Sequence, residues 1–274
     1  MTDLPLLGAA MPTATLETLQ DFILSENRDL EIQDFCDGDL LNGDWKTVAD
    51  HTRNLLTGYT GRLGIHGPFW GLNIASPDTE MRALNKRKHL QGIEVCEYLG
   101  ATQMVIHSPY TTWSFNNLDN APDRKEYDRL LENCHDTMDA VVKRAEDCGV
   151  TMVIENIEDI DPDIRCALAD SFNSPAMAVS IDTGHAHYAH GTNGAAPVDY
   201  YVRRAGDRLQ HIHLQDADGY ADRHWAIGQG TIRWEAVFRA LGELGSNPRL
   251  ILELRDKDGI LPSVAYLQSL GIAR

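Results

Sequence analysis

Eight short β-rich runs alternate with longer helical patterns along the whole chain, and this order constrains the fold more than any other feature. The runs cover residues 6–11, 30–35, 62–68, 104–109, 151–157, 177–185, 209–217 and 249–255. Strands that alternate with helices are typical of βα units around a parallel sheet. Eight such units in 274 residues suit a (β/α)8 TIM barrel. We therefore expect an α/β fold with a single TIM barrel domain over residues 1–274.

The connections between the expected elements differ in length at the two ends of the strands. Short segments lead from helices into strands, and the helix expected before the fifth run ends at Gly149. The segments that leave the strands are longer, and we expect loops at 111–122, 186–197 and 216–230, the first of them a mobile lid. Active sites of TIM barrels are built from the loops at this end.

The charge and cysteine content limit which molecules and which cellular compartment the protein suits. The chain has 41 acidic and 24 basic residues and a formal charge of -17, so its average surface repels nucleic acids and anionic membranes. Its five cysteines form no CxxC pair, which argues against disulfides and against a thiolate zinc site. The sequence contains neither a secretory signal nor an apolar run long enough to span a membrane. We expect a cytoplasmic protein, and a homo-oligomer is compatible with this reading.

Side chains that commonly bind metals lie at the ends of six successive runs: His66, His107, Glu155, Asp182 with His185, His213 and Glu253. Alternation along a strand places the carboxylates on the face that points into the barrel mouth. A buried carboxylate is costly unless a partner neutralises it. Asp222 and His224 add two further candidates in the loop after the seventh run. Oxygen and nitrogen ligands without thiolate predict a divalent metal such as zinc, manganese, cobalt or magnesium.

Several other side chains near these positions are candidates for substrate binding. Four aromatic residues lie beside the proposed ligands and could stack on a sugar ring, although loop packing explains them equally well: Phe69, Trp70, Trp113 and Trp225. Arg255 could contact a phosphate or carboxylate, or pair with nearby acids. His211 lies one layer deeper than His213, so we expect it in the core or in support of a ligand.

Seven segments, HGPFWGLNIASPD, VIHSPY, VIEN, IDTGH, IHLQDADG, DRHWAIGQGTIRW and LILEL, resemble the superfamily of xylose-isomerase-like TIM barrels. This superfamily unites sugar phosphate isomerases and epimerases with endonuclease-four-type apurinic endonucleases. The likeness runs from about residue 30 to about residue 256 and implies the roles of several residues. Four of them match the site that binds one divalent metal in the isomerase and epimerase branch: Glu155, Asp182, His213 and Glu253. His185 matches a residue near the substrate in that branch.

The same resemblance extends to the trinuclear zinc site of the endonuclease branch, so it implies one to three metals per chain. His66, His107 and Glu155 would surround one of these metals. Another would lie among His185, Asp222 and His224. Two departures argue against DNA as a substrate: the second run lacks the basic segment expected there, and Phe69 replaces a tyrosine. Together with the negative charge, they make a nucleic acid an unfavourable partner.

These observations favour a metal-dependent isomerase or epimerase that acts on a small sugar, sugar phosphate or polyol. Glu155 and Glu253 would serve as base and acid on opposite faces of the substrate, with His185 beside them. The first alternative is a multinuclear zinc phosphodiesterase of the apurinic endonuclease type. The second is a barrel that holds a metal and binds a small ligand without turnover.

Overall fold

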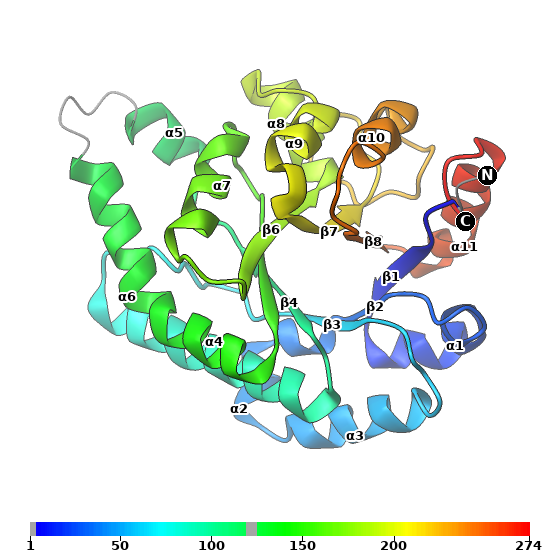
Figure 1. The fold of residues 1–274 in the computed structure, drawn as a ribbon, viewed down its shortest axis with the longest axis horizontal. Helices are drawn as coiled ribbons and strands as arrows, with labels where there is room; N and C mark the ends of the chain where they lie inside the picture. Colours follow the sequence, from blue (N-terminus) through cyan, green and yellow to red (C-terminus); the bar gives the residue numbers. More distant parts are fainter. Residues whose placement is uncertain (1–3, 119–124) are drawn as a thin grey trace.

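Eight parallel strands close into a barrel in chain order in the computed structural model, which describes residues 4–118 and 125–274 (Figure 1). The strands are β1 (Leu7–Met11), β2 (Leu30–Ile32), β3 (Leu63–His66), β4 (Gln103–His107), β5 (Thr151–Glu155), β6 (Met177–Asp182), β7 (Leu209–Leu214) and β8 (Arg249–Leu252). Leu7 of β1 pairs with Leu250 of β8, which closes the sheet. Each expected run overlaps one of these strands, so the predicted (β/α)8 TIM barrel is confirmed.

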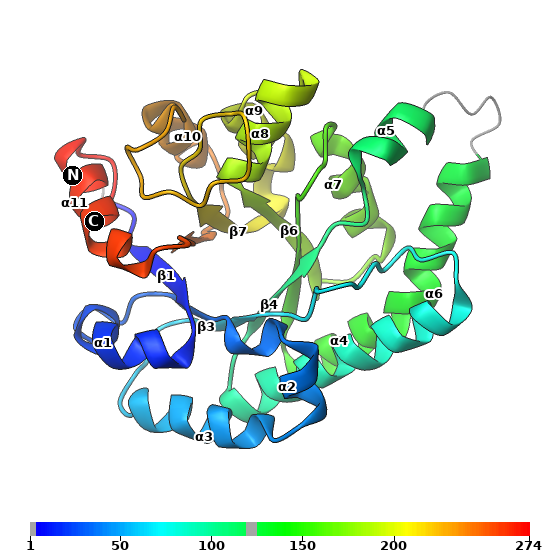
Figure 2. The ribbon, with the colours of Figure 1, turned by 180° about the vertical axis from the view of Figure 1, so that it is seen from behind.

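Helices cover the outside of the barrel, as the two opposite views show (Figures 1 and 2). They are α1 (Thr13–Leu24), α2 (Gly38–Asn42), α3 (Trp45–Leu55), α4 (Thr79–Leu99), α5 (Thr112–Leu118), α6 (Lys125–Cys148), α7 (Pro162–Ser171), α8 (Thr183–Asn193), α9 (Val198–Ala205), α10 (Trp234–Leu241) and α11 (Ile260–Ser269). Short 3-10 turns are η1 (Asp34–Cys36), η2 (Gly206–Arg208) and η3 (Lys257–Gly259).

The main hydrophobic core lies between the strands and these helices. Helix α6 illustrates why, because Cys134, Met138 and Val141 recur at helical spacing and are all fully buried. Each fully buried apolar side chain of this size contributes roughly 1.5–3 kcal/mol. The helix ends at Cys148, and Gly149 after it adopts a left-handed conformation at φ 68° that glycine tolerates without strain. The expected stop signal is therefore confirmed.

The interior of the barrel is different from this outer core. Val105, Val153 and Ala178 form a small separate apolar layer inside it. Alternation along β5 places Glu155 on the same face as Val153, one layer nearer the carboxyl end. The interior of the barrel therefore combines a small apolar layer with buried ionisable side chains.

Three sequence expectations about local structure were wrong. The sixth run was expected to continue to residue 185, but β6 ends at Asp182 and α8 begins at Thr183, so His185 is presented by the first turn of a helix. The segment 186–197 was expected to be a loop, yet α8 continues to Asn193. The segment 111–122 was expected to be a loop that acts as a lid, but residues 112–118 form α5, and residues 119–122 lie outside the described residues.

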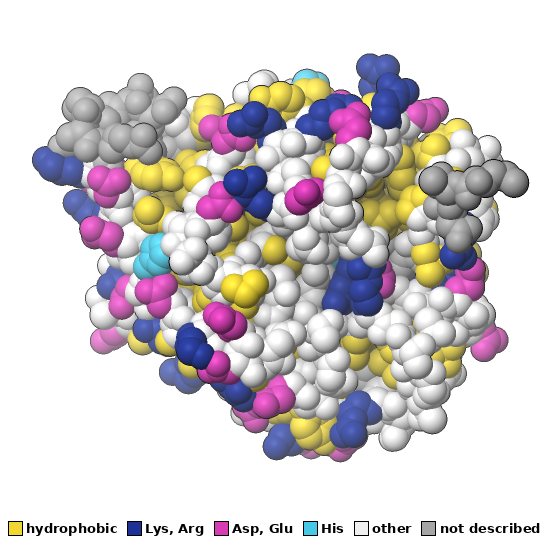
Figure 3. Space-filling view, in the orientation of Figure 1, with side chains coloured by type: hydrophobic (Ala, Val, Ile, Leu, Met, Phe, Trp, Pro, Cys, Tyr) yellow, Lys and Arg dark blue, Asp and Glu magenta, His cyan; other side chains and the backbone are white. Residues whose placement is uncertain are grey.

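Acidic and basic side chains are interspersed on the face shown in Figure 3. Ion pairs also join neighbouring segments of the chain. Arg204 of α9 donates to Asp163 of α7 at 2.7 Å, and Arg203 of α9 donates to Glu243, which follows α10, at 2.9 Å. Among the described residues, no helix is both long and apolar enough to cross a membrane.

Candidate metal centre

Four buried side chains meet at the carboxyl end of the barrel, and their potential ligand atoms all lie within 4.8 Å of one another: Glu155, Asp182, His213 and Glu253. Glu155 and Asp182 are the last residues of β5 and β6, and Glu253 follows β8 directly. His213 is fully buried between two of them, with Nδ1 3.0 Å from Glu155 Oε1 and 3.2 Å from Glu253 Oε2. The sequence predicted all four residues at this end.

The electrostatics of this cluster suit a cation. Glu155 Oε2 and Asp182 Oδ2 are buried without a hydrogen-bond partner among the described residues. Burial raises the pKa of Asp182 to about 6, and the neighbouring carboxylates of Glu155 and Glu253 add to this effect. Burial alone would also raise the pKa of Glu155, but the adjacent histidines, His213 first, lower it below its ordinary value. Three carboxylates and one imidazole therefore converge as a ligand set that fits a divalent metal.

A second group lies on one side of this cluster and consists of His66, His107 and Glu155. The Nε2 atoms of both histidines lie 3.8 Å from Glu155 Oε2. Burial lowers the pKa of His107 to about 3, which keeps its ring neutral and able to donate a lone pair. Phe69 stacks on the His107 ring with centroids 4.2 Å apart, so it packs against a candidate ligand.

A third group lies on the other side and consists of Asp182, His185 and His224. Asp222 belongs to the same neighbourhood, since its Oδ1 lies 3.5 Å from His185 Nε2 and 3.1 Å from His224 Nε2. His185 Nδ1 lies 2.9 Å from the carbonyl oxygen of Asn156, which orients the ring. Although burial opposes it, the acids around His224, Asp222 first among them, raise its pKa to about 9.

Some residues that hold the candidate ligands were not identified from the sequence. Gln215 donates from Nε2 to Asp182 Oδ1 and to Asp222 Oδ1, each at 3.1 Å. Gln33 donates to Glu253 Oε1 at 2.8 Å. Glu31, in the middle of β2, faces His213 from below. Glu31 could have been identified from the sequence, because an acidic residue in the middle of a short apolar strand indicates a buried carboxylate.

The residues expected to bind substrate lie around the mouth. Trp70 and Trp113 are 72% and 71% exposed, so their rings are open to solvent. Trp225 and Arg255 line a hollow of about 360 Å³ together with Asp222. This hollow adjoins the third group and gives a small molecule a place next to the candidate ligands.

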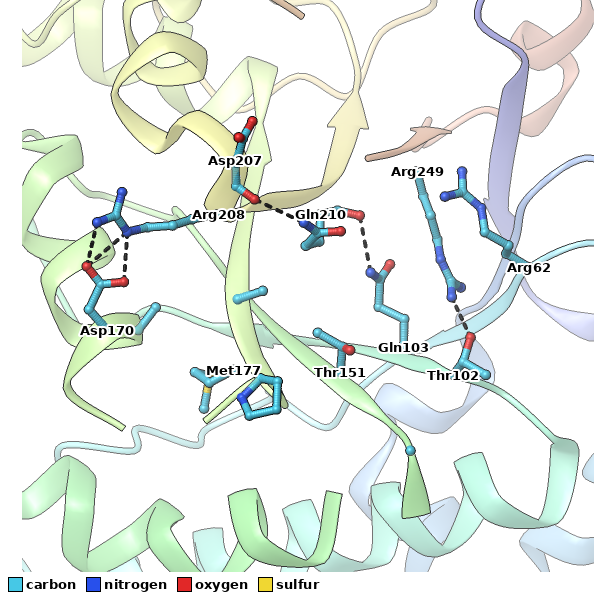
Figure 4. Close-up of a pocket in the computed structure, with 14 residues that line it drawn as sticks. Arg62, Thr102, Gln103, Thr151, Asp170, Met177, Asp207, Arg208, Gln210 and Arg249 are labelled. Atoms are coloured by element: carbon cyan, nitrogen blue, oxygen red, sulfur yellow. Dashed lines mark hydrogen bonds and ion pairs between the residues drawn. The ribbon is translucent and has the colours of Figure 1, made fainter. Parts of the chain in front are cut away.

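Another hollow, of about 480 Å³, lies at the opposite end of the barrel, where Gln103 and Arg249 begin their strands (Figure 4). Its basic side chains already contact neighbours. Arg208 donates to Asp170 at 2.7 Å, and Arg249 Nη2 donates to Thr102 Oγ1 at 2.6 Å. The ionisable groups described above lie at the other end of the strands, so this hollow is separate from the candidate metal centre.

Comparison with known proteins adds a family to this geometry. A family model described as xylose isomerase-like TIM barrel matches residues 34–270. An uncharacterized protein of Methanocaldococcus jannaschii is 27% identical over 201 residues, which are 71% of this chain and 65% of that protein. The chain thus matches slightly less than two thirds of that relative's length. Fructoselysine 3-epimerase of Shigella flexneri is 26% identical over 218 residues, 76% of this chain and 71% of that enzyme.

Solved structures give the same fold. A D-tagatose 3-epimerase-like protein superposes with a TM-score of 0.78 at 24% identity, covering 97% of each chain. A Thermus thermophilus protein, studied after soaking with ZnCl2, superposes with a TM-score of 0.72 at 26% identity. The match covers 98% of this chain and 99% of the Thermus protein.

Proposed function

Because the chain belongs to the xylose isomerase-like TIM barrel family, we propose that it is a divalent-metal-dependent epimerase or isomerase of ketoses or their derivatives. The observation that carries the proposal is the buried convergence of Glu155, Asp182, His213 and Glu253 on one point at the barrel mouth. The similarity to fructoselysine 3-epimerase supports a ketose derivative as the substrate class.

The chemistry requires a proton to leave the carbon beside a carbonyl and to return from the other face. A bound divalent cation would polarise the carbonyl and the neighbouring hydroxyl, which makes this proton more acidic. Glu155 and Glu253 approach the same nitrogen of His213 from different strands, at 3.0 and 3.2 Å. Two carboxylates that reach one point from different sides can act as base and acid on opposite faces of a substrate.

Two further features serve binding in this scheme. His185 stands beside Glu155, with Nδ1 3.6 Å from Glu155 Oε1, and would contact the substrate oxygens. Trp225 and Arg255 line the adjoining hollow and would hold the far end of the substrate. Phe69, Trp70 and Trp113 would exclude water from the mouth when the substrate is bound.

The proposal is tested by exchange of a carbon-bound proton with solvent. The purified protein, supplied with manganese, cobalt, magnesium or zinc, is incubated in D2O with D-psicose, D-tagatose or fructoselysine. NMR should show deuterium at carbon 3 together with the epimeric ketose. Deuterium at carbon 1 with formation of an aldose would instead identify an isomerase.

Glu253→Gln is the critical variant, because it keeps the size of the side chain and removes the proposed acid or base. We expect exchange to fall by at least about 100-fold, the lower end of what a general acid or base contributes. Glu243→Gln is the matched control, since Glu243 is a surface residue paired with Arg203. Absence of exchange with every metal and sugar would contradict the epimerase and favour a non-catalytic binding barrel.

One observation supports a second candidate, a multinuclear zinc phosphodiesterase. The groups on either side of the centre, His66 with His107 and His185 with His224, are also close enough to hold metals. Clustered metals can activate water and stabilise a leaving oxygen in phosphodiester hydrolysis. Metal analysis separates the candidates, since about three zinc ions per chain would favour hydrolysis and one ion would favour the epimerase.

A further inference from the structure

Both nitrogens of the His213 ring face carboxylates. On one side, Nδ1 points to Glu155 and Glu253 in the candidate metal centre. On the other side, Nε2 lies 3.1 Å from Glu31 Oε1 and 3.2 Å from Glu31 Oε2. His213 is fully buried and Glu31 is 2% exposed, so this second contact is closed to water.

The chemistry of these groups fixes how the ring can be protonated. An ionised carboxylate can only accept hydrogen bonds, so the contact with Glu31 requires a proton on Nε2. Without a cation, the contact of Nδ1 with Glu155 Oε1 at 3.0 Å requires a proton on that nitrogen as well. A cation in the centre would take the place of this second proton. The ring would then present its lone pair on Nδ1 to the cation and keep the proton on Nε2 for Glu31.

Glu31 is itself held in place. It is the central residue of β2, and its backbone pairs with Ala10 of β1 and Gly64 of β3. His211 Nε2 lies 3.0 Å from Glu31 Oε2, although without the alignment of a hydrogen bond. The other nitrogen of His211 lies 2.8 Å from Ser180 Oγ. Four strands besides β2, namely β1, β3, β6 and β7, therefore fix the environment of this carboxylate.

We propose that Glu31 is a positioning residue that holds His213 with a proton on Nε2, so that Nδ1 is directed at the divalent cation of the candidate centre. This inference rests on the proposed function, because it assumes that a cation binds there. Carboxylates behind metal-binding histidines orient the ring and increase its basicity, and their loss typically weakens metal binding by about 10- to 100-fold.

The test compares cobalt binding by the full-length protein and two variants. Glu31→Gln keeps the shape of the side chain and removes its charge. Asp29→Asn is the matched control, because Asp29 is a buried acid two residues earlier that contacts Arg62 instead of a histidine. We expect Glu31→Gln to bind cobalt about 10-fold more weakly or worse at unchanged stoichiometry. Asp29→Asn should bind as the wild type does.

A second measurement does not depend on bound metal. Proton and nitrogen-15 NMR of the metal-free protein, with the His213 signals assigned from a His213→Gln variant, reports the hydrogen bond that the Nε2 proton makes. In the wild type this proton should resonate far downfield because it is bound by a buried carboxylate, and Glu31→Gln should move its signal upfield. A residue that only stabilised the fold would leave this signal unchanged. Should Glu31→Gln fail to fold, Glu31→Asp, which retracts the carboxylate from the ring, takes its place with the same expectations.

The outcomes separate the two proposals. If the wild type binds no cobalt, the metal centre and the proposed function fail, and the signal of the Nε2 proton alone decides whether Glu31 orients His213. Unchanged cobalt affinity and an unchanged Nε2 proton signal in Glu31→Gln would overturn the inference and leave the proposed function standing. Loss of one of two bound cobalt ions would also overturn it, because Glu31 would then bind a metal itself together with His211 and His213.

Discussion

Gly184, the second residue of α8, leaves the space that Gln215 occupies. A Cβ atom at this position would lie 2.2 Å from both Cδ and Oε1 of Gln215, well inside the contact distance. The amide of Gln215 cannot yield easily, because its Oε1 accepts from the backbone N–H of His224 at 2.7 Å. Its Nε2 donates at the same time to Asp182 and Asp222. The absence of a side chain at Gly184 therefore leaves room for Gln215 to make its three hydrogen bonds around the third group.

Gly184→Ala should destabilise the protein by about 1–3 kcal/mol, the usual cost of an added methyl group in a packed interior. The displaced amide should also weaken metal binding. Urea unfolding measures the first effect and cobalt titration the second. Gly242→Ala is the control, because its nearest neighbours would be 3.5 Å away and its φ of -68° suits any residue. Equal stability of the two variants would contradict this account of Gly184.

At the residue scale, the sequence predicted the candidate metal ligands better than the residues that hold those ligands in place. Glu155, Asp182 and Glu253 could be identified because each ends a run of apolar residues and shares a face with the residue two positions before it. Glu31 was not identified as a supporting residue from the sequence, because its partners, His211 and His213, lie about 180 residues away along the chain. Only closure of the barrel brings β2 across from β7, and no local pattern reports that distance.

At the scale of elements, α8 forms a helix although its glycine content disfavours one. The segment 186–197 was expected to be a loop, and it contains Gly191, although glycine costs about 1 kcal/mol in a helix interior. The helix forms nonetheless. The carboxylate of Asp182 accepts from the N–H of His185 at 2.7 Å and caps its start. A Cβ at Gly191 would lie 1.9 Å from the carbonyl oxygen of Gly219, so close packing against the next loop requires the same glycine that weakens the helix.

Variants in the loop after β7 can distinguish the two candidate functions. This loop supplies both Asp222 and His224, which only the phosphodiesterase requires as metal ligands. Replacing both with alanine should leave the metal held by Glu155, His213 and their neighbours in place if the protein is an epimerase. Activity should then fall mainly through KM, since the substrate loses contacts in the hollow lined by Asp222 and Trp225. Metal analysis and steady-state kinetics measure the two effects.

A phosphodiesterase would respond differently to the same double variant. One metal should be lost, and the chemical step should slow by about 100-fold or more, as expected when a group that stabilises developing charge is removed. Glu155→Gln controls the experiment, because both schemes place that carboxylate on a metal. Loss of one metal together with phosphodiesterase turnover would reverse our preference.

At the scale of the whole molecule, the barrel could be predicted because eight separate signals agreed. Each expected run overlaps a strand, and the strands pair in chain order around the closed sheet. The ends of the elements were less predictable. Asp182 ends a strand and caps a helix, so the sequence around it satisfies the rules for both.

Metal removal should lower the thermal stability of the whole domain. Without a cation, the three carboxylates of the centre remain crowded in a buried site. A cation at about 100 times its Kd stabilises the folded state by about 2.7 kcal/mol. In a domain of this size that corresponds to a Tm increase of about 5 °C or more. Calorimetry with and without a chelator tests this, and identical curves after verified metal removal would argue against the centre.

The three groups of candidate ligands share members, and this has a thermodynamic consequence. Glu155 belongs both to the central cluster and to the group with His66 and His107. Asp182 belongs both to the central cluster and to the group with His185 and His224. A cation that engaged a shared carboxylate would change the charge that a neighbouring cation meets. If cations bind at more than one of these positions, their occupancies would be linked, and the affinity at each position would depend on what the other two hold.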